Sequence, residues 1–255
     1  MVTGRILVTG ATGHLGRRVA HELVQSGQTV RVLTRQRPAH PDARYEWAEG
    51  NYISGDGLAQ AFEGVDEVLH LAHDPQHPER DLTGVARLHS FGLAAGIRHF
   101  TQVGIVGAAQ VPGFPYYAAK AQAEELLLKS GLHASIFQAT QFHSFVYPLL
   151  AKLERLPLLL VPTGLLQPVD IGEVAAALSR HVLKRQPITE RFAGPEVLTI
   201  AELAEQMLAA KHQHKPVVSI GLPLAAFQAV RKGVLTAPQM ARGQRTFAEW
   251  LRLKA

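Results

Sequence analysis

A glycine-rich segment between an apolar run and a helical stretch constrains this chain most. Thr9–Gly16 (TGATGHLG) places glycines at positions 10, 13 and 16, directly after the run Arg5–Thr9 and at the start of the periodic stretch His14–Ser26. In such a strand–turn–helix unit the first glycine makes a tight turn, the second lets a pyrophosphate approach the backbone, and the third lets helix and strand pack closely. The helix start adds free N–H groups and the positive end of its dipole. The spacing therefore predicts a dinucleotide site rather than a purely structural turn.

The alternation of apolar runs and helical stretches continues over the first half of the chain. The expected strands are 5–9, 29–34, 67–72, 98–103 and 134–139, and the expected helices are 14–26, 58–62, 82–95 and 116–130. Strand–helix units repeated in this way form right-handed crossovers between parallel strands. We therefore predict an α/β fold of the Rossmann type, a doubly wound, mostly parallel sheet with helices on both faces.

The alternation weakens after about residue 140. The expected helices are 170–183, 199–211, 224–232 and 246–253, the expected strands are 158–161 and 217–220, and prolines 148, 157, 162 and 168 are expected to mark turns. This pattern predicts a dinucleotide-binding domain over 1–140 and a smaller, partly helical substrate lobe over 141–255. The boundary is soft, and the lobe is expected to lie over the carboxyl edge of the sheet.

Composition narrows the classes of protein that fit. The chain has no cysteine, which excludes disulfides, thiolate metal ligands and a thiol nucleophile. Its net charge of +5 comes from scattered basic residues, a distribution that favours a phosphorylated small ligand over nucleic acid. No run approaches the roughly 20 apolar residues of a membrane span, and Arg5–Val8 is too short for a secretion signal. We expect a cytoplasmic protein with a small-molecule substrate, no nucleic-acid or membrane partner, and a monomeric or homodimeric state.

Three closely spaced histidines, His70, His73 and His77, could suggest a metal site. His70 lies in an expected buried strand, and the spacing offers no matched set of ligands. We expect structural or cofactor-lining histidines and no metal.

The end of the second expected strand bears on which dinucleotide is bound. A site specific for NAD usually places Asp or Glu there, against the ribose 2′-hydroxyl. This chain has Thr34-Arg35-Gln36-Arg37 instead. A guanidinium is a planar, bidentate partner for a 2′-phosphate. We predict that NADPH is preferred over NADH and that Arg35 contacts the 2′-phosphate, with the relative roles of Arg35 and Arg37 left open.

Several segments besides the glycine turn fit one known pattern. They are LTR (33–35), HLA (70–72), GIRHF (96–100), PYYAAK (115–120) with Glu124, ATQF (139–142), QPVDIGEVA (167–175), Gly194-Pro195 and TFAEWL (246–251). With them the chain resembles the short-chain dehydrogenase/reductase superfamily, most closely its atypical, NmrA-like, NAD(P)H-binding branch. The resemblance implies a cofactor across the carboxyl edge of the sheet. The implied cofactor contacts are the turn (Gly10, Thr12, Gly13, His14, Leu15, Gly16), Arg35, Asn51 near the adenine, and Ala72 and His73 near the ribose.

Tyr116 and Lys120 form a Tyr-x-x-x-Lys pair at the family's catalytic position. Residues i and i+4 of a helix share a face, so the phenol and the ammonium can serve one site. The ammonium favours the phenolate and can also hold the nicotinamide ribose, while the tyrosine can pass a proton to a reduced carbonyl. We predict Tyr116 as the acid and Lys120 as a catalytic and cofactor-binding residue. Tyr117 is the alternative acid, and simple packing of these tyrosines is the structural alternative.

One expected partner of this pair is missing. Members of the superfamily usually carry Ser or Thr about a dozen residues before the tyrosine, where this chain has Gly104. Thr101 lies too far back for that register. Loss of one hydroxyl that stabilises an oxyanion typically costs about 10²–10³ in rate. A quinone or a conjugated cation yields a weaker base than a ketone does, so the sequence favours such acceptors over simple alcohols.

The segment after the fifth expected strand is expected to lie at the mouth of the substrate crevice. Phe142 and Phe145 could stack a flat ligand there, and His143 could relay a proton. The alternative is that these aromatic residues pack the lobe onto the sheet.

Together these features predict an NADPH-dependent reductase of quinone-like or conjugated acceptors. The retained Tyr116 and Lys120 favour an enzyme, while Gly104 favours the alternative, a non-catalytic regulator that senses NADP(H) and binds a partner protein. Epimerase chemistry on a nucleotide-linked sugar is disfavoured, because such sites commonly keep the hydroxyl that is missing here and the second lobe is short.

Overall fold

The computed structural model describes residues 4–153 and 157–254. The chain divides into two compact units, the first comprising residues 1–104, 119–137 and 175–190 and the second residues 105–118, 138–174 and 191–255. Residues 175–190 lie beyond the predicted boundary at 140 and belong to the first unit. Neither unit is therefore one continuous segment of the chain.

The central sheet has seven strands in the order β3-β2-β1-β4-β5-β6-β9. Its strands are β1 (Arg5–Thr9), β2 (Thr29–Thr34), β3 (Glu46–Glu49), β4 (Glu67–His70), β5 (His99–Ile105), β6 (Ala134–Ala139) and β9 (Thr189–Phe192). The pairs β1–β2, β1–β4, β2–β3 and β4–β5 are parallel. The strand order changes direction between β1 and β4, as in a doubly wound sheet. The predicted Rossmann-type fold is confirmed.

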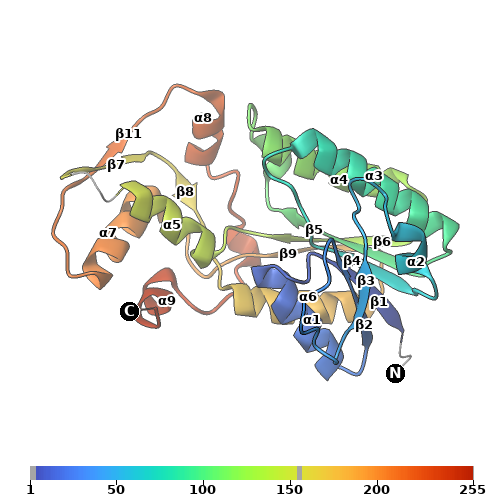
Figure 1. Cartoon of the computed structure of the whole chain (residues 1–255). Helices are drawn as coiled ribbons and strands as arrows, with labels where there is room; N and C mark the ends of the chain where they lie inside the picture. The colour runs from blue at the N-terminus through green and yellow to red at the C-terminus, as the bar shows by residue number, and fades with distance from the viewer. Residues whose placement is uncertain (1–3, 154–156, 255) are drawn as a thin grey trace. The chain divides into compact units, whose positions relative to one another are not determined.

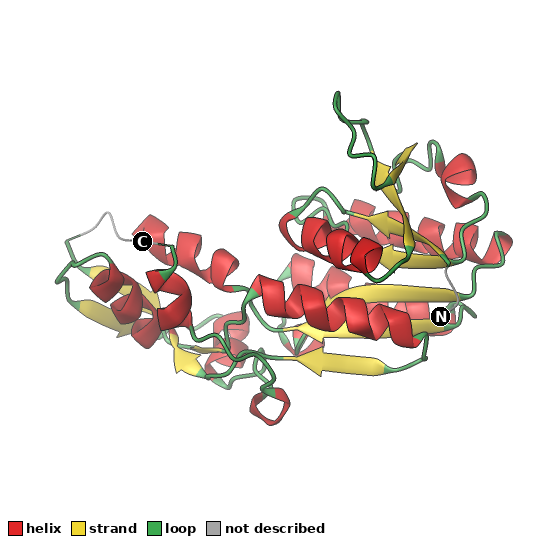
Figure 2. Cartoon of the chain, turned by 90° about the horizontal axis from the view of Figure 1, so that it is seen from below, coloured by secondary structure: helices red, strands yellow, loops and turns green. Residues whose placement is uncertain are grey.

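Helices cover both faces of this sheet. They are α1 (His14–Gln25), α2 (Leu58–Phe62), α3 (Pro78–Ala94), α4 (Pro115–Lys129) and α6 (Ile171–Lys184). Figure 1 shows α1 and α6 on one face and α3 and α4 on the other, and Figure 2 shows the strands between helical layers from below. Fully buried Leu7, Val68 and Phe100 form part of the core under α2, α3 and α4. Burial of such side chains is the main force that holds the layers together.

Two strands of the central sheet, β3 and β9, were missed by sequence reasoning because little apolar surface marks them. β3 (EWAE) is an edge strand that is mostly half-buried. The Glu46 carboxylate pairs with Arg5 at 2.9 Å and with Arg31 at 2.8 Å, which ties β3 to β1 and β2. β9 (TERF) is likewise largely polar. Alternating charge and cross-strand pairing, rather than hydrophobic periodicity, place these strands.

The second unit contains mostly helices with short two-stranded ribbons. Its elements are η1 (Ala108–Gln110), α5 (His143–Leu153), β7 (Leu159–Pro162), β8 (Leu165–Leu166), β10 (Leu198–Thr199), α7 (Ile200–Ala210), β11 (Val217–Ile220), α8 (Ala225–Arg231), η2 (Pro238–Met240) and α9 (Phe247–Arg252). β7 pairs in parallel with β11, and β8 pairs antiparallel with β10. Val146, Leu159, Met207 and Phe247 belong to its core. The segments Thr199–Glu202 and Thr246–Glu249 form capping boxes that start α7 and α9.

The expectation that Pro148 marks a turn was wrong. Pro148 lies inside α5, which spans His143–Leu153. A proline there removes the hydrogen bond to the carbonyl four residues earlier. Val146 and Leu150 are buried in the core of the second unit, and their packing keeps the helix despite this loss.

Within the described ranges, none of the helices combines the length and the apolar character that crossing a membrane would need.

Candidate functional site

The turn between β1 and α1 requires glycine at two of its three glycine positions. Gly10 has a φ of +69°, and a Cβ there would lie 2.6 Å from the backbone nitrogen of Ala72. A Cβ on Gly16 would lie 2.1 Å from the carbonyl oxygen of Gly10. These clashes show that packing within the protein accounts for Gly10 and Gly16.

Gly13 has no such structural reason. A Cβ there would meet a single neighbour, the carbonyl oxygen of Gly10 at 3.3 Å, which needs only a small adjustment. Gly13 is also the N-cap of α1, where no side chain caps the helix and no acidic residue occupies the first turn. The turn thus leaves a bare backbone beside an uncapped helix start, the arrangement that accepts a pyrophosphate. His14 and Leu15 open this helix, and Thr12 is exposed beside it.

Ala72 follows β4, the strand that pairs with β1. Its backbone N–H donates to Oγ1 of Thr9 at 3.1 Å, and the N–H of Leu71 donates to the same oxygen at 3.1 Å. These hydrogen bonds join the end of β1 to the segment that follows β4. His73, the next residue, is exposed at this edge.

The other predicted adenosine contacts follow β2 and β3, which run parallel to β1. Arg35 and Arg37 are exposed directly after β2. Burial and a hydrogen bond to Asp81 raise the pKa of Tyr52, and the charge of Arg35 acts in the opposite direction. The Asn51 side-chain oxygen accepts the N–H of Ile53 at 2.9 Å, so it orders the loop after β3.

Lys120 lies on the part of α4 that belongs to the first unit, and its side chain is only 8% exposed. Burial lowers the pKa of Lys120, while the carboxylates of Asp81 and Glu124 act in the opposite direction. The pKa of His73 is lowered by the surrounding protein and then by the Lys120 ammonium, although the His73 ring is exposed. Lys120, His73 and Asp81 therefore share one electrostatic environment.

Asp81 is a site residue that sequence reasoning missed. It lies in the first turn of α3, is 5% exposed, and accepts a hydrogen bond from the hydroxyl of Tyr52. An acid in the first turn of a helix is ordinarily explained by the helix dipole alone. Only the fold shows that this carboxylate is buried and close to Lys120.

The two tyrosines at the start of α4 differ in their surroundings. Tyr117 packs with Val111, Ala226 and Leu235, and burial raises its pKa. Tyr116 is half-buried, with its ring centroid 5.8 Å from that of Tyr117. Tyr117 therefore packs within the second unit, and the assignment of Tyr116 as the acid stays a prediction. Tyr116 belongs to the second unit, and it shares with Lys120 the spacing of about one turn on α4.

Gly104, at the position where related enzymes usually carry Ser or Thr, lies near the end of β5. Gly104 is buried there. The nearby hydroxyl of Thr101 lies 3.1 Å from that of Ser135, which in turn lies 2.9 Å from Nε2 of His99. Thr101 is therefore engaged in a buried network, and odd spacing on a strand turns its side chain to the face opposite residue 104.

His143 is placed differently from the predicted crevice loop. It begins α5, is 1% exposed, and its Nε2 lies 3.1 Å from the carbonyl oxygen of Arg245. Burial lowers the pKa of His143, and its ring packs against Phe247 and Trp250. A carbonyl only accepts, so Nε2 of His143 carries a proton and donates it to this hydrogen bond. These contacts give His143 a structural role in the second unit.

The two phenylalanines beside it also differ. Phe142 forms an isolated bridge with Val169 and is half-buried, whereas Phe145 is 52% exposed. Phe145 is the aromatic side chain of this segment that remains available to a ligand.

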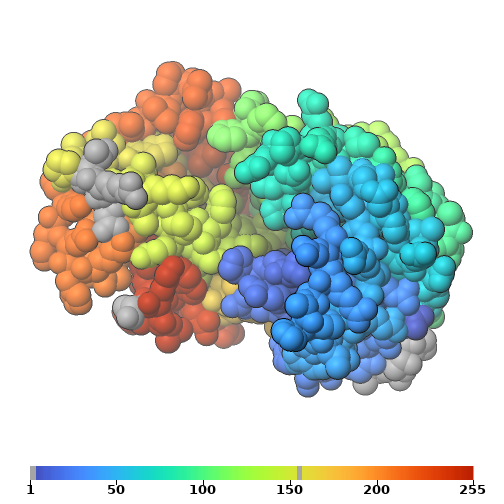
Figure 3. Space-filling view, in the orientation of Figure 1, coloured from blue at the N-terminus to red at the C-terminus, as the bar shows by residue number. Residues whose placement is uncertain are grey.

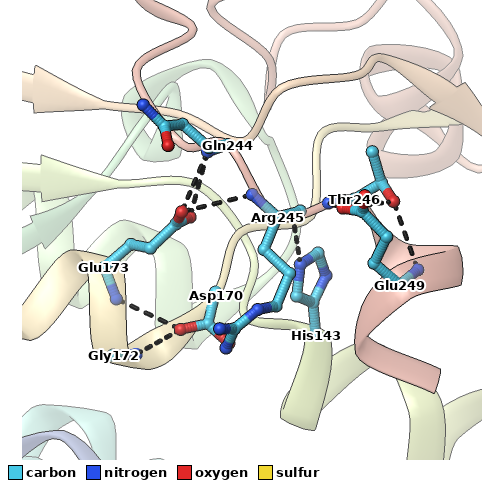
Figure 4. Close-up of polar contacts among 8 residues, drawn as sticks. All are labelled: His143, Asp170, Gly172, Glu173, Gln244, Arg245, Thr246 and Glu249. Atoms are coloured by element: carbon cyan, nitrogen blue, oxygen red, sulfur yellow. Dashed lines mark hydrogen bonds and ion pairs between the residues drawn. The ribbon is translucent and has the colours of Figure 1, made fainter. Parts of the chain in front are cut away.

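The segment 167–175 builds a second cluster that sequence reasoning did not anticipate (Figure 4). The Asp170 carboxylate accepts the N–H groups of Gly172 at 2.8 Å and Glu173 at 3.1 Å, and it pairs with Arg245 at 3.0 Å. Glu173 accepts the backbone N–H groups of Gln244 at 3.0 Å and Arg245 at 3.2 Å. This cluster caps α6 and fixes the chain that leads into α9.

In the described part of the chain, no three His, Asp or Glu side chains are arranged to hold a metal ion.

Comparison with known proteins assigns the family. A family model described as NAD(P)H-binding matches residues 10–144, more than half of the chain. The chain belongs to the NAD(P)H-binding family. The resemblance to the atypical, NmrA-like short-chain type is confirmed, and with it the prediction of an oxidoreductase at the level of the family.

Two curated relatives are reductases. The (4-alkanoyl-5-oxo-2,5-dihydrofuran-3-yl)methyl phosphate reductase of Streptomyces griseus is 28% identical over 79% of this chain and 72% of its own length. The ceramide reductase of Caulobacter vibrioides is 32% identical over 48% of this chain and 41% of its own length. The second match therefore spans less than half of that relative.

Solved structures share the fold over nearly the whole chain. A nucleoside-diphosphate-sugar epimerase from Staphylococcus aureus has a TM-score of 0.83 at 18% identity, covering 97% of this chain and 99% of its own. The NADPH-dependent quinone oxidoreductase of Escherichia coli, complexed with NADPH, has a TM-score of 0.80 at 18% identity, covering 98% and 99%. The triphenylmethane reductase of Citrobacter sp., complexed with NADP(H), has a TM-score of 0.78 at 17% identity, covering 98% and 100%. At these identities the likeness shows the fold alone.

Proposed function

We propose that this chain is an NADPH-dependent reductase of quinone-like or conjugated small-molecule acceptors. The observation that carries the proposal is the end of β5, where Gly104 stands at the position of the usual hydroxyl, while Tyr116 and Lys120 keep their spacing on α4. A site without that hydroxyl suits acceptors that develop little basic charge on oxygen.

The residues for cofactor binding fit a dinucleotide. The bare backbone at Gly13 and the uncapped start of α1 would hold the pyrophosphate. Arg35, with no acidic residue among its neighbours 34–37, would pair with the 2′-phosphate. When bound, NADPH supplies the hydride, and Ala72, His73 and Asn51 would line the adenosine and ribose.

Lys120 and Tyr116 would divide the remaining work. Lys120 is buried, and the charges of Asp81 and Glu124 favour its ammonium form. The ammonium can donate a hydrogen bond to a ribose hydroxyl and place a positive charge at the site. Tyr116 can supply the proton that an acceptor takes up with the hydride. His143 has no part in this proposal because it is buried and bonded to the Arg245 carbonyl.

The names of relatives support this acceptor class. The substrate name of the Streptomyces griseus relative describes a dihydrofuranone ring whose carbon–carbon double bond is conjugated with its carbonyl. A quinone and a triphenylmethane dye, the acceptors of two proteins with this fold, are conjugated in the same sense.

The test is an acceptor panel with the full chain. NADPH absorbance is followed with quinones, triphenylmethane dyes, simple ketones and, in reverse, simple secondary alcohols. We expect turnover with quinones or dyes, at least 100-fold loss in Lys120→Ala and a smaller loss in Tyr116→Phe, while Tyr117→Phe stays near wild type. Robust activity on a simple secondary alcohol with inert quinones would refute the acceptor class. Tight NADPH binding with no turnover on any acceptor would instead favour the regulator that binds a partner protein.

A further inference from the structure

Helix α5 carries apolar side chains on two opposite sides. Val146 and Leu150 are buried in the core of the second unit. On the other side Phe145 is 52% exposed, Leu149 is 46% exposed, and Pro148 is exposed as well. Pro148 and Leu149 follow Phe145 by three and four positions, so the three side chains share one side of the helix. An apolar stripe of α5 is therefore left open to solvent.

Helix α9 adds an exposed leucine and basic side chains to this surface. Leu253, the residue after α9, is 74% exposed, and its neighbours Arg252 and Lys254 are exposed too. Nζ of Lys254 lies 3.8 Å from the ring centroid of Tyr147 on α5. Figure 3 shows the yellow-green atoms of α5 and the red atoms of α9 side by side on the face toward the viewer. The exposed residues of both helices form what we call the α5–α9 face, which comprises Phe145, Pro148, Leu149, Lys152, Arg252, Leu253 and Lys254.

Two aromatic rings lie beneath the Lys254 ammonium. Tyr147 and Trp250 are half-buried, and their ring centroids are 5.8 Å apart. Nζ of Lys254 lies 5.1 Å from the Trp250 ring in addition to its contact with Tyr147. Lysine combined with tyrosine, tryptophan and leucine is typical of protein surfaces that meet lipid headgroups. Lysine is depleted in protein–protein interfaces, so this composition favours a lipid surface over a protein partner.

The charge of this part of the molecule suits an anionic surface. The second unit contains 11 Lys and Arg residues against 7 Asp and Glu residues, so it carries +4 of the net charge of +5. α5 has no acidic residue, and the one acid of α9, Glu249, is engaged in the capping box with Thr246. The α5–α9 face itself holds basic residues and no acid, which makes it complementary to negatively charged headgroups.

We propose that the α5–α9 face docks on an anionic lipid bilayer. Its exposed apolar side chains enter the headgroup layer, and its basic side chains pair with lipid phosphates and carboxylates. Docking of this kind needs no helix that spans the bilayer. It goes beyond the expectation of no membrane partner, which rested on the lack of a spanning run. The inference does not depend on the proposed function, because the face uses neither a cofactor nor an acceptor.

The first experiment measures binding of the full chain to vesicles by flotation. Vesicles of pure phosphatidylcholine are compared with vesicles of equal parts phosphatidylcholine and phosphatidylserine, at low and at high ionic strength. We expect binding to the mixed vesicles at low ionic strength, little binding to the neutral ones, and loss of binding when salt screens the charges.

A charge variant tests the basic side chains. Lys152→Gln combined with Lys254→Gln should weaken binding to the mixed vesicles about 25-fold, since each basic residue near an anionic surface contributes about fivefold. Lys129→Gln combined with Arg180→Gln is the matched control, because it removes the same charge from exposed positions of the first unit. The control should change binding less than about twofold.

An apolar variant tests insertion. Leu149→Gln combined with Leu253→Gln should weaken binding at least about tenfold. The same change at Leu93 and Leu128, which are 49% and 69% exposed in the first unit, should leave binding unchanged. All these positions are exposed, and a melting temperature equal to that of the wild type checks that each variant is folded.

Trp250 reports contact with lipid directly. The chain has two tryptophans, so Trp47→Phe leaves Trp250 as the sole emitter. Its emission should shift to shorter wavelength on the mixed vesicles and be quenched by brominated lipid.

Absence of vesicle binding, equal binding to neutral and anionic vesicles, or equal losses in the variants and their controls would overturn the proposal. Emission from Trp250 that brominated lipid leaves unquenched would do the same. Sedimentation velocity tests the other occupant. If the wild type is a dimer that Leu149→Gln with Leu253→Gln disperses, and it binds no vesicles, the face joins two copies of the chain and the lipid inference fails.

Discussion

Oγ1 of Thr9 lies 2.8 Å from Nδ1 of His70, across the adjacent ends of β1 and β4. The same oxygen already accepts the N–H groups of Leu71 and Ala72, so its hydrogen must point to His70. His70 Nδ1 is therefore the acceptor, and the ring is the neutral Nε2–H tautomer. Burial lowers the pKa of His70 well below its usual value, in agreement with a neutral ring.

This junction should be sensitive to the loss of one hydroxyl. Thr9→Val keeps the shape of the side chain but leaves buried polar groups unpaired, so we expect a loss of about 2–4 kcal/mol in unfolding free energy. Urea denaturation measures the loss. Thr9→Ser retains the hydroxyl and should stay within about 1 kcal/mol of the wild type. A valine variant as stable as the serine variant would contradict this assignment of hydrogen bonds.

Two glycine substitutions in the turn should separate an effect on stability from an effect on dinucleotide binding. Gly16→Ala forces a Cβ to 2.1 Å from the Gly10 carbonyl oxygen and should destabilise the chain by more than about 3 kcal/mol. Gly13→Ala meets only one neighbour at 3.3 Å and should fold with a melting temperature close to that of the wild type. Its methyl group would occupy the space of the pyrophosphate, so dinucleotide affinity should fall at least tenfold. Full affinity in Gly13→Ala, measured by fluorescence titration, would place the pyrophosphate elsewhere.

Buried histidines should make stability fall in mild acid. Burial lowers the pKa of His89 and of His99 to about 4, and both rings are almost fully buried. Well above the usual histidine pKa of about 6.5 both rings are neutral in the folded and the unfolded chain, so they contribute no pH dependence there. Between about pH 6.5 and 4 only the unfolded chain takes up these protons, and each ring should cost up to about 1.4 kcal/mol per pH unit.

Urea denaturation at pH 7, 6 and 5 measures this slope. His89→Gln should flatten it, whereas His40→Gln, an exposed control, should leave it unchanged. A slope that is identical in all three chains would mean that His89 titrates alike in both states.

The Asp170 cluster should stabilise the second unit. Asp170→Ala removes the acceptor for two N–H groups at the start of α6 and leaves Arg245 without its carboxylate, so we expect a loss of about 2–3 kcal/mol. Arg245→Ala removes only a half-exposed ion pair and should cost about 1 kcal/mol or less. Thermal unfolding compares the two variants. Equal losses would show that the ion pair, rather than the helix cap, supplies the stability.

The sequence by itself determined the parallel sheet, the glycine turn and most helices of the first half. These features depend on neighbouring residues: apolar runs set strands, a period of 3.6 residues sets helices, and glycines set turns. The proposed preference for NADPH also depends on a local pattern, Arg35 in place of an acid at the end of β2. These features can be predicted from sequence because the residues that cause each of them lie close together in the chain.

Only the tertiary structure decided the features that depend on distant partners. β3 is held by the contact of Glu46 with Arg5 and Arg31, and α5 survives Pro148 because its apolar side chains are buried. The assignment of residues 175–190 to the first unit and the burial of Asp81 against Tyr52 are of the same kind. In each case the free energy comes from burial or pairing between segments far apart in the chain, which local periodicity does not encode.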